Sequence, residues 1–410
     1  MVIFNDGVAE TALPDTNVVH TDVLIVGSGP AGSSAALFLS SLGIPNIMIT
    51  KYRWTANTPR AHITNQRTME IFRDMGIEDQ VLADATPHEM IGDTVFCTSI
   101  AGEEIGRILS WGNHPARHAD YELASPSLNC DIPQTYLEPI LVKNATVRGT
   151  QTQFSTEYIS HTQDADGVSV RVLNRLTGTE YTIRAKYLIG ADGARSKVAA
   201  DIGLPYEGQM DIAGSMNITF KADIAGLVGH RPSVLYWVVQ PGSNIGGIGA
   251  GLVRMVRPWN EWLIVWGFDI NGEPPTVTDE SAAQIVRNLI GVPDLDVEIT
   301  GTSLWGNNEQ YAIRLQSGRV FCAGDACTST RRATVLAPTP PSRTPTTWRG
   351  RSRPYLTGRP AKRSWIPTLP SAPRWQNRSS PGPTSPDGNS ASSSKPSEST
   401  RQRAPTKCTP

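Results

Sequence analysis

The stretch TDVLIVGSGPAG at residues 21–32 constrains this chain most, because it joins an apolar run to three glycines spaced G-x-G-x-x-G. The run at 23–26 is typical of a strand buried on both faces of a parallel sheet. In such a turn, Gly27 permits the tight bend, Gly29 lets the backbone approach a pyrophosphate, and Gly32 lets the next helix pack on the strand. The sequence therefore predicts a dinucleotide site with its phosphates at the helix N-terminus; the alternative is a purely structural glycine turn.

The neighbouring residues support a nucleotide-binding unit. An Ala/Leu-rich helix is predicted from Ala31 to about Leu42, and a second strand at 46–50. Such a strand usually ends in an acid that holds the adenosine ribose, about 20 residues beyond the glycines. Thr50 and Lys51 stand there instead. A hydroxyl can still accept from or donate to the ribose, so we expect these two residues at that end of the site.

Length and composition narrow the class of protein. With 410 residues and 39% hydrophobic content, the chain exceeds one typical domain, and two domains are expected. No apolar run approaches the roughly 20 residues that span a bilayer, and the polar start lacks a secretion signal, so a cytoplasmic protein without a membrane partner is expected. The five scattered cysteines never form C-x-x-C, which indicates neither a disulfide framework nor a metal site.

Two later apolar runs also end in polar residues. They are YLIGADGARS at 187–196 and GRVFCAGDAC at 318–327. In open α/β sheets, ligands gather at the carboxyl ends of the strands, although an isolated Asp-Gly is usually only a turn. The residues at these two strand ends are Asp192, Gly193, Arg195, Gly324 and Asp325.

Between residues 204 and 301 the pattern changes to long alternating strands, which predicts a separate, mostly antiparallel sheet. Strand-like segments also occur at 91–109. We expect some of four tryptophans to line a pocket for a flat apolar ligand, and the rest to pack in the core. These are Trp237, Trp259, Trp262 and Trp266. Further predictions are helices at 67–75, 131–145 and 280–290, a hairpin of 153–160 with 167–173, and a strand at 181–185.

Three motifs, GSGPAG at 27–32, GADGARS at 190–196 and AGDA at 323–326, together resemble the single-component (group A) FAD-dependent aromatic monooxygenases. That family includes p-hydroxybenzoate and phenol hydroxylases. RWTANTPRAHITNQRTMEIFRD and QPGSNIGGIGAGLVRMVRPWNEWLIVWGFDI are similar to the 2,4-dichlorophenol 6-monooxygenase branch. The likeness covers about Val19 to Cys327. It implies a Rossmann-like α/β FAD-binding domain with an inserted, mostly antiparallel substrate domain.

The resemblance also implies the chemistry. FAD would be held noncovalently and reduced by NADPH or NADH, and a phenolic or related aromatic substrate would be hydroxylated with O2 through a flavin C4a-hydroperoxide. A homodimer is expected, with no nucleic-acid partner. By motif position, the residues near FAD would be Gly27, Gly29, Gly32, Arg60, Gln134, Asp192, Gly193, Arg195 and Asp325.

We expect the protein itself to supply one further step, removal of the proton from the phenol, because deprotonation makes the ring more nucleophilic. His62 lies two residues beyond Arg60, where phenol hydroxylase places an aspartate. We therefore consider His62 a catalytic base, and a structural or flavin-packing histidine is the alternative.

The chain changes character after Cys327. From Thr328 onward it has 15 Lys or Arg, 2 Asp or Glu and 15 of the 31 prolines, so the tail carries +13 and the remainder −14. This Pro/Ser/Thr/Arg-rich stretch lacks the apolar content to fold, and it replaces the family's flavin-ring loop and terminal helix. A basic tail that binds anions or nucleic acid is the simple explanation.

We hypothesise instead that the tail is frame-shifted. In the shifted frame, each codon consists of the third base of a codon for one residue of the given sequence and the first two bases of the codon for the next residue. The segment 336–350 then permits GSNTSIQDAYNLAW, and 365–380 permits DTYSAERAPVAKQIV, strings that look like the family's missing helix and the segment after it. From Cys327 the same frame permits HIDTPSNGLG, the missing flavin loop.

The chain is predicted to divide at four points. An N-terminal arm spans 1–20, and the FAD-binding domain spans 21–203 with interleaved substrate-domain strands near 91–110. The substrate domain spans 204–305, the chain returns to the FAD-binding domain at 306–327, and the tail at 328–410 is disordered. Another FAD oxidoreductase or a halogenase on the same fold, and an inactive remnant, are the alternatives to a monooxygenase.

Overall fold

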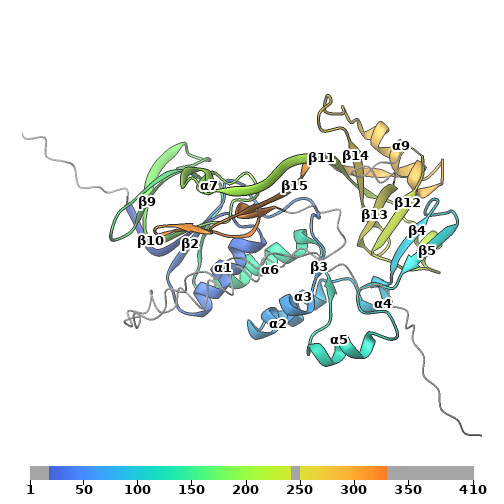
Figure 1. The fold of residues 1–410 in the computed structure, drawn as a ribbon, viewed down its shortest axis with the longest axis horizontal. Coiled ribbons are helices and arrows are strands. Elements are labelled where there is room, and N and C mark those ends of the chain that lie inside the picture. Colours follow the sequence, from blue (N-terminus) through green and yellow to red (C-terminus); the bar gives the residue numbers. More distant parts are fainter. Residues whose placement is uncertain (1–17, 242–249, 330–410) are drawn as a thin grey trace, which may run out of the picture. The chain divides into compact units, whose positions relative to one another are not determined.

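The computed structural model describes residues 18–241 and 250–329 (Figure 1). Most of the predicted N-terminal arm and nearly all of the predicted disordered tail lie outside these residues. Within the described ranges, no helix is both long and apolar enough to cross a membrane.

The first sheet has the strand order β16-β17-β10-β1-β2-β7, and β17, β10, β1, β2 and β7 run parallel. β16 pairs antiparallel with β17, while β9 and β8 continue antiparallel from β10. The strands are β1 Val18–Val26, β2 Asn46–Ile49, β7 Gln151–Gln153, β8 Thr156–Gln163, β9 Val168–Asn174, β10 Thr179–Gly190, β16 Gln316–Ser317 and β17 Val320–Cys322.

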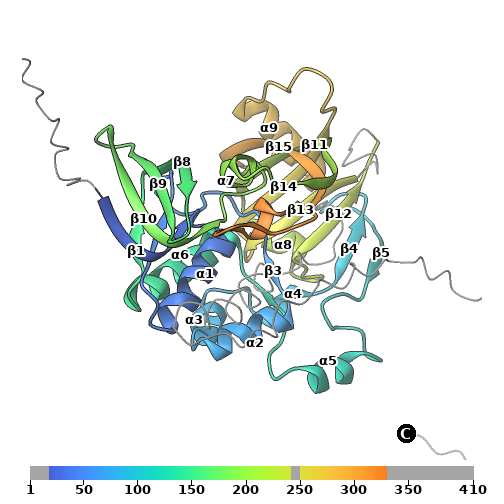
Figure 2. The ribbon, with the colours of Figure 1, turned by 60° about the vertical axis from the view of Figure 1, so that its left-hand side comes forward.

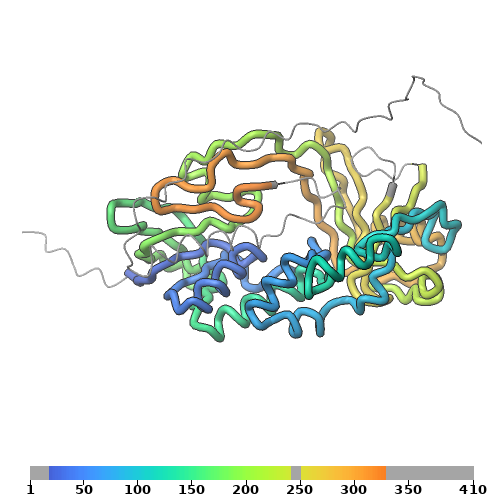
Figure 3. The backbone as a smooth tube through the Cα atoms, turned by 60° about the horizontal axis from the view of Figure 1, so that its bottom comes forward, coloured from blue at the N-terminus to red at the C-terminus, as the bar shows by residue number. Residues whose placement is uncertain are grey.

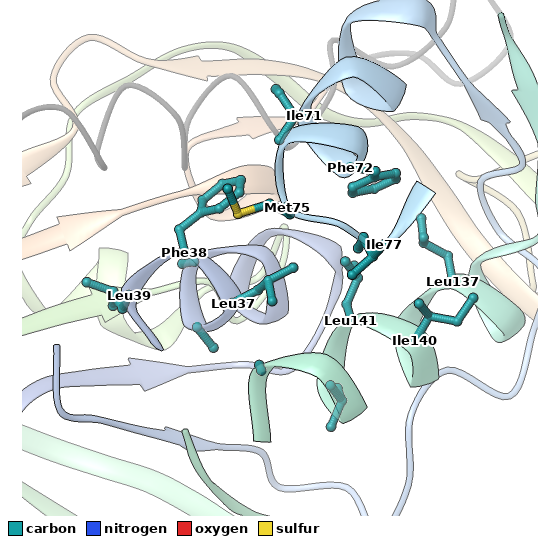
Figure 4. Packing of buried hydrophobic residues seen from close by; sticks show 14 of the residues in the cluster. Leu37, Phe38, Leu39, Ile71, Phe72, Met75, Ile77, Leu137, Ile140 and Leu141 are labelled. Atoms are coloured by element: carbon teal, nitrogen blue, oxygen red, sulfur yellow. The ribbon is translucent and has the colours of Figure 1, made fainter. Parts of the chain in front are cut away.

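The last four residues of β1, Val23–Val26, are buried on both faces of the sheet, which agrees with their apolar run. Val23 and Ile25 belong to a core with helices α1 (Pro30–Ser41) and α6 (Gln134–Val147), which lie side by side (Figure 2). Leu24 and Val26 belong to a second core with β9 and β10. Figure 4 shows the first core, where α1 and α6 meet α2 (Gln66–Asp74) through Leu37, Phe38, Ile71, Phe72, Met75, Ile77, Leu137, Ile140 and Leu141.

The second sheet has the order β18-β15-β11-β14-β13-β12-β4-β5, and only β12 and β4 pair in parallel. Its longest pair, β11 with β15, runs side by side from Tyr206↔Ala312 to Lys221↔Glu298 (Figure 3). The strands are β4 Thr94–Cys97, β5 Glu104–Ile108, β11 Tyr206–Lys221, β12 Leu235–Val239, β13 Ala250–Arg257, β14 Glu261–Phe268, β15 Glu298–Ala312 and β18 Thr328–Ser329.

Helix α9 (Asp279–Ile290) covers one face of this sheet. The buried residues that face it come from alternate positions of the strands, including Tyr236, Val253 and Ile264. Gly251 is part of this fit, because a Cβ there would lie 2.7 Å from the Leu289 side chain. The opposite face of the sheet is therefore the one left for other contacts.

The remaining elements are short. A two-stranded antiparallel sheet pairs β3 with β6. Their bounds, with those of the other helices, are β3 Ile63–Thr64, β6 Cys130–Asp131, α3 Glu78–Ala83, α4 His88–Ile91, α5 His118–Ala124, α7 Lys197–Asp201, α8 Ala225–Val228 and the 3-10 helix η1 Gly324–Ala326.

The predicted helices at 31–42, 67–75, 131–145 and 280–290 are found within three residues of their predicted ends. Two details differ from the sequence-based expectation. The strands expected separately at 181–185 and from 187 are one strand, β10, because β10 pairs with β1 without a break from Thr182 to Gly190. The strands at 91–109 join the second sheet through the parallel pair β4–β12.

Candidate functional site

The glycine turn after β1 is shaped by close backbone contacts. Gly27 has φ +106°, and a Cβ there would lie 2.2 Å from the Ala191 carbonyl oxygen. A Cβ on Gly32 would lie 1.8 Å from the Gly27 oxygen, so both positions exclude a side chain. Gly29 differs, because a Cβ on it would meet only Glu138 Oε1, at 3.8 Å. Space beside Gly29 is thus open, as close approach by a ligand requires.

The N-terminus of α1 is suited to an anion. Gly29 is its N-cap residue, Pro30 follows, and no side chain within the described residues caps the helix. The unpaired amides and the helix dipole favour a negatively charged group at this end. Together with the open space at Gly29, this fits a pyrophosphate.

The carboxyl ends of four parallel strands meet at one edge of the first sheet. Val26 pairs with Ile49 and with Gly190, and Gly190 pairs with Cys322. The predicted site residues that come after these strand ends are Gly27, Thr50, Asp192 and Gly324. The structure thus gathers residues from distant parts of the sequence at one edge.

Asp192 makes its contacts within its own segment. Its carboxylate accepts hydrogen bonds from the Ser196 hydroxyl and, at 2.8 Å, from the Lys197 amide at the start of α7. Arg195 is 81% exposed and lies 3.6 Å from Asp211 of β11. Neither side chain points to a ligand by itself, and their cofactor contacts stay predictions.

Two glycines near this edge have positive φ, +90° at Gly193 and +64° at Gly324. A Cβ on Gly193 would meet no atom within 4 Å, whereas one on Gly324 would lie 2.6 Å from the Ala31 side chain. Gly324 therefore lets η1 approach the start of α1. Asp325, the next residue, is exposed beside that helix start.

The residues expected at the adenosine end come directly after β2. Thr50 is buried, and its amide donates to the Gln153 carbonyl at 3.0 Å. Lys51 is exposed, with its ammonium 5.5 Å from the centre of the Tyr52 ring. Arg60 is also exposed and donates to the Thr58 hydroxyl at 3.3 Å.

Glu138 is a candidate site residue that the sequence analysis did not identify. Its carboxylate accepts hydrogen bonds from Gln134 and from the Ala56 amide, each at 2.6 Å, beside the open space at Gly29. Burial raises the pKa of Glu138, and these two hydrogen bonds and the charge of Arg60 oppose the rise. The sequence signal was an acid inside the apolar helix run LEPILV.

His62 lies in a second cluster of polar side chains. The sequence analysis identified His62 but not its neighbours in this cluster. Its Nδ1 is 3.8 Å from Asp131 Oδ1, and Arg254 of β13 donates to the same oxygen at 3.3 Å. The Thr86 hydroxyl donates to the other Asp131 oxygen at 2.9 Å. The side chains of His62 and Asp131 are fully buried. Among the described residues, neither ring nitrogen of His62 has a hydrogen bond of standard geometry.

The protonation of this cluster follows from burial. Burial lowers the pKa of His62 well below 6.5, Arg254 lowers it further, and a backbone contact at Pro59 opposes the shift. Burial raises the pKa of Asp131, while Arg254 and Thr86 oppose the rise. The imidazole is therefore neutral near pH 7, with acceptor capacity to spare.

The face of the second sheet opposite α9 is aromatic and partly open. Phe96 and Trp237 pair across β4 and β12 and stack with ring centres 6.2 Å apart. Leu252 and Val265 continue this row across β13 and β14, and Phe96, Leu252 and Val265 are only partly buried. Arg254, two residues beyond Leu252, shares this face. The row therefore leads toward the His62 cluster.

The four tryptophans differ in which face of the second sheet they occupy and in how far they are buried. Trp262 is 1% exposed in the core under α9 and donates to two backbone carbonyls. Trp237 lies on the partly open face, and among the described residues its indole N–H has no partner; the same holds for the indole of Trp259. Trp266, two residues beyond Ile264, is on the same face of β14 as Trp262 and Ile264 and is partly buried against that core.

The sequence of this chain is similar to a known protein family and to proteins of known activity. The family model described as "FAD binding domain" matches residues 20–331. Phenol 2-monooxygenase of Pseudomonas sp. (strain EST1001) is 71% identical over 328 residues, which cover 79% of this chain and 52% of that protein. 2,4-dichlorophenol 6-monooxygenase of Cupriavidus pinatubonensis (strain JMP 134 / LMG 1197) is 56% identical over 75% of this chain and 52% of that protein.

A solved structure, the flavin-dependent monooxygenase PieE in complex with FAD and substrate, is 42% identical with a TM-score of 0.72. That likeness covers 76% of this chain and 54% of PieE. The chain thus spans about half the length of the relatives that it matches. The predicted fold class is confirmed by this likeness and by the two sheets described above.

Proposed function

Because this chain belongs to the family of FAD binding domains, we propose that it acts in an FAD-dependent monooxygenase that hydroxylates a phenolic or related aromatic compound. NADPH or NADH and O2 would be the co-substrates. The observation that carries this proposal is the pairing of two features in one chain. Open space suited to a pyrophosphate lies beside Gly29, and a partly open aromatic face leads to a buried, neutral His62.

FAD fits the residues present. The open side of Gly29 and the uncapped start of α1 would hold its pyrophosphate, and Thr50 and Lys51 would meet the adenosine end. Arg60, Gln134, Asp192, Gly193, Arg195, Gly324 and Asp325 complete the proposed set. When bound, FAD supplies electron transfer and oxygen activation, while the protein binds, orients and excludes water.

An aromatic substrate fits the open face of the second sheet. Phe96 and Trp237 offer flat apolar surface, on which an aromatic ring packs in an offset or edge arrangement. The relatives named above act, by their names, on phenol and on 2,4-dichlorophenol, which supports a phenolic substrate. The indole N–H of Trp237, which has no partner in the part of the chain that the structure describes, offers a donor to a polar substituent.

His62 is proposed as the base. Because its imidazole is neutral, one ring nitrogen can accept the hydroxyl proton of a phenol, which leaves the more nucleophilic phenolate. The full burial of His62 keeps competing water from that nitrogen.

The proposed enzyme has two parts in this chain. Residues 21–203 and 306–327 would form the FAD-binding part, and 204–305 the substrate part, together with the strands near 91–110. A cytoplasmic homodimer is proposed as its setting. Light scattering of the purified chain tests the dimer, and a monomer mass would contradict it.

The function is tested by incubating the purified chain with FAD, NADPH or NADH, and a panel of phenols under isotopically labelled O2. We expect one labelled oxygen atom in the hydroxylated product. Cofactor oxidation without labelled product would favour another FAD oxidoreductase. His62→Gln should retain FAD and lose most of the product.

A further inference from the structure

The buried ion pair of Asp131 and Arg254 lies beside His62. It is not among the residues proposed to hold FAD, and the proposed role of His62 as a base does not by itself require it. Asp131 is completely buried, and it receives hydrogen bonds from Thr86 and Arg254. Arg254 comes from β13 of the second sheet, 123 residues away in sequence. An isolated pair of buried charges costs several kcal/mol in desolvation, so it is weak support for stability.

The polar atoms of this cluster do not satisfy one another, as those of a purely structural cluster would. Both nitrogens of His62 and the Nε of Arg254 are buried without a hydrogen-bond partner among the described residues. Buried donors and acceptors are nearly always satisfied in folded proteins, and exceptions call for a ligand, a water or a functional reason. The unsatisfied atoms belong to one cluster, next to the aromatic row of the second sheet.

We propose that Asp131 and Arg254 are positioning residues for His62, and that the three side chains receive the hydroxyl oxygen of the aromatic substrate. Asp131 fixes one side of the imidazole and holds the guanidinium of Arg254 beside it. The other ring nitrogen is left for the substrate hydroxyl. This inference rests on the proposed function and names the residues that recognise the ionising oxygen.

The proton balance of the step is simple. The substrate O–H bond breaks, an N–H bond forms on His62, and the electron pair stays on the substrate oxygen as a phenolate. Asp131 stabilises the resulting imidazolium from 3.8 Å, and Arg254 stabilises the phenolate. No oxidant or reductant takes part.

Among the described residues, two charged side chains are close to His62. Asp131 of β6 and Arg254 of β13 face it, and the backbone at Pro59 also contacts it. Arg254 opposes protonation of His62, so loss of its charge should raise the His62 pKa. The side-chain amide of a glutamine in place of Arg254 can still donate a hydrogen bond to the Asp131 carboxylate, which keeps its charge beside His62. Arg254→Gln is therefore a tolerable change.

The test uses the full chain. NMR titration of the histidine ring protons follows the His62 pKa, and the missing signal in His62→Gln identifies the resonance. Absorbance of added 4-nitrophenol reports the ionised fraction of the bound probe, because only its phenolate absorbs visible light. The variants are Arg254→Gln, the conservative Arg254→Lys, and Asp131→Asn combined with Arg254→Gln. Arg171→Gln, from an exposed ion pair with Glu180, is the matched control.

In Arg254→Gln we expect the His62 pKa to rise by about 1 unit, as for one nearby charge. Loss of the Arg254 charge should also raise the pKa of the bound 4-nitrophenol itself by about 1 unit, so its ratio of phenolate to phenol at a given pH should fall about tenfold. Arg254→Lys should largely restore both values, Arg171→Gln should change neither, and the double variant should show the same loss of phenolate.

An unchanged His62 pKa in folded Arg254→Gln would overturn the proposal. So would equal ionisation of the bound probe in the wild type and the double variant. If the wild-type chain binds no probe at all, the proposed phenolic substrate fails instead, and the NMR titration still decides whether Arg254 positions His62.

Discussion

Three glycines within six positions meet different physical needs. Gly27 and Gly32 are required by the fold, because a Cβ at either would strike backbone atoms. Gly29 has φ −63°, which any residue adopts, and space beside it. Packing therefore does not require a glycine at this position, and we propose that a bound pyrophosphate does.

This difference makes a prediction. Gly32→Ala should lower the melting temperature measured by circular dichroism, since the Gly27 carbonyl must move. Gly29→Val should leave the melting temperature within a few degrees but weaken FAD binding at least tenfold, or about 1.4 kcal/mol. Flavin fluorescence titration measures the affinity. Equal FAD affinity of Gly29→Val and the wild type would contradict the pyrophosphate site.

A second prediction concerns pH and His62. The unfolded chain takes up a proton on His62 below about 6.5, whereas the folded chain, with its lowered pKa, does not until lower pH. The stability that the neutral imidazole contributes is present above pH 6.5 and is lost as the pH falls.

Denaturant unfolding between pH 7 and 5 measures this loss. The wild type should lose up to about 1.4 kcal/mol per pH unit more than His62→Gln does. Identical pH dependence of the two proteins would show that His62 has the same pKa in the folded and unfolded chains, and would contradict the lowered pKa.

At the scale of elements, short sequence patterns predicted the helices and strands that depend on neighbouring residues. The apolar run at 23–26, the three glycines and the Ala/Leu-rich stretch that follows them were enough to predict β1, α1 and β2. Contacts across long sequence separations were not predictable in this way. The bond of Arg254 to Asp131 depends on two sheets meeting, and no spacing in the sequence encodes that.

The second sheet shows the same limit. Alternation predicted its strands but gave no sign of which face α9 covers. The burial of Trp262 and the partial openness of the Trp237 face follow from that single packing choice. The parallel pairing of β4 with β12 likewise depends on a connection of more than 100 residues.

The two tryptophans give a matched pair of variants. Trp262→Leu should lower the free energy of unfolding by about 3 kcal/mol, through lost packing and two lost hydrogen bonds. Trp237→Leu should cost less. Only Trp237→Leu should weaken 4-nitrophenol binding, about fivefold, as the loss of one aromatic contact of about 1 kcal/mol implies. A stronger binding defect in folded Trp262→Leu would place the substrate elsewhere.

At the scale of the whole molecule, the charge of the chain divides at one point. The match to the family ends at residue 331, close to Cys327, where the basic, proline-rich sequence begins. The one-base shift that we hypothesise would account for both the lost likeness and the strings that the shifted frame permits.

Sequencing the coding DNA tests the shift. We expect the frame that begins at Cys327 to stay open and to encode GSNTSIQDAYNLAW and DTYSAERAPVAKQIV or close variants of them. Stop codons in that frame, or codons that cannot give these residues, would contradict the hypothesis and leave the written tail as the native one.

The most direct test of the central claim is the visible absorbance spectrum of the purified protein after incubation with FAD and removal of free cofactor. It is recorded for the 410-residue chain and for a version with the restored frame. We predict the bands of bound flavin in the restored protein, and their loss in its Gly29→Val variant. If neither the written nor the restored chain retains flavin, the assignment of this fold as an FAD-dependent enzyme is wrong.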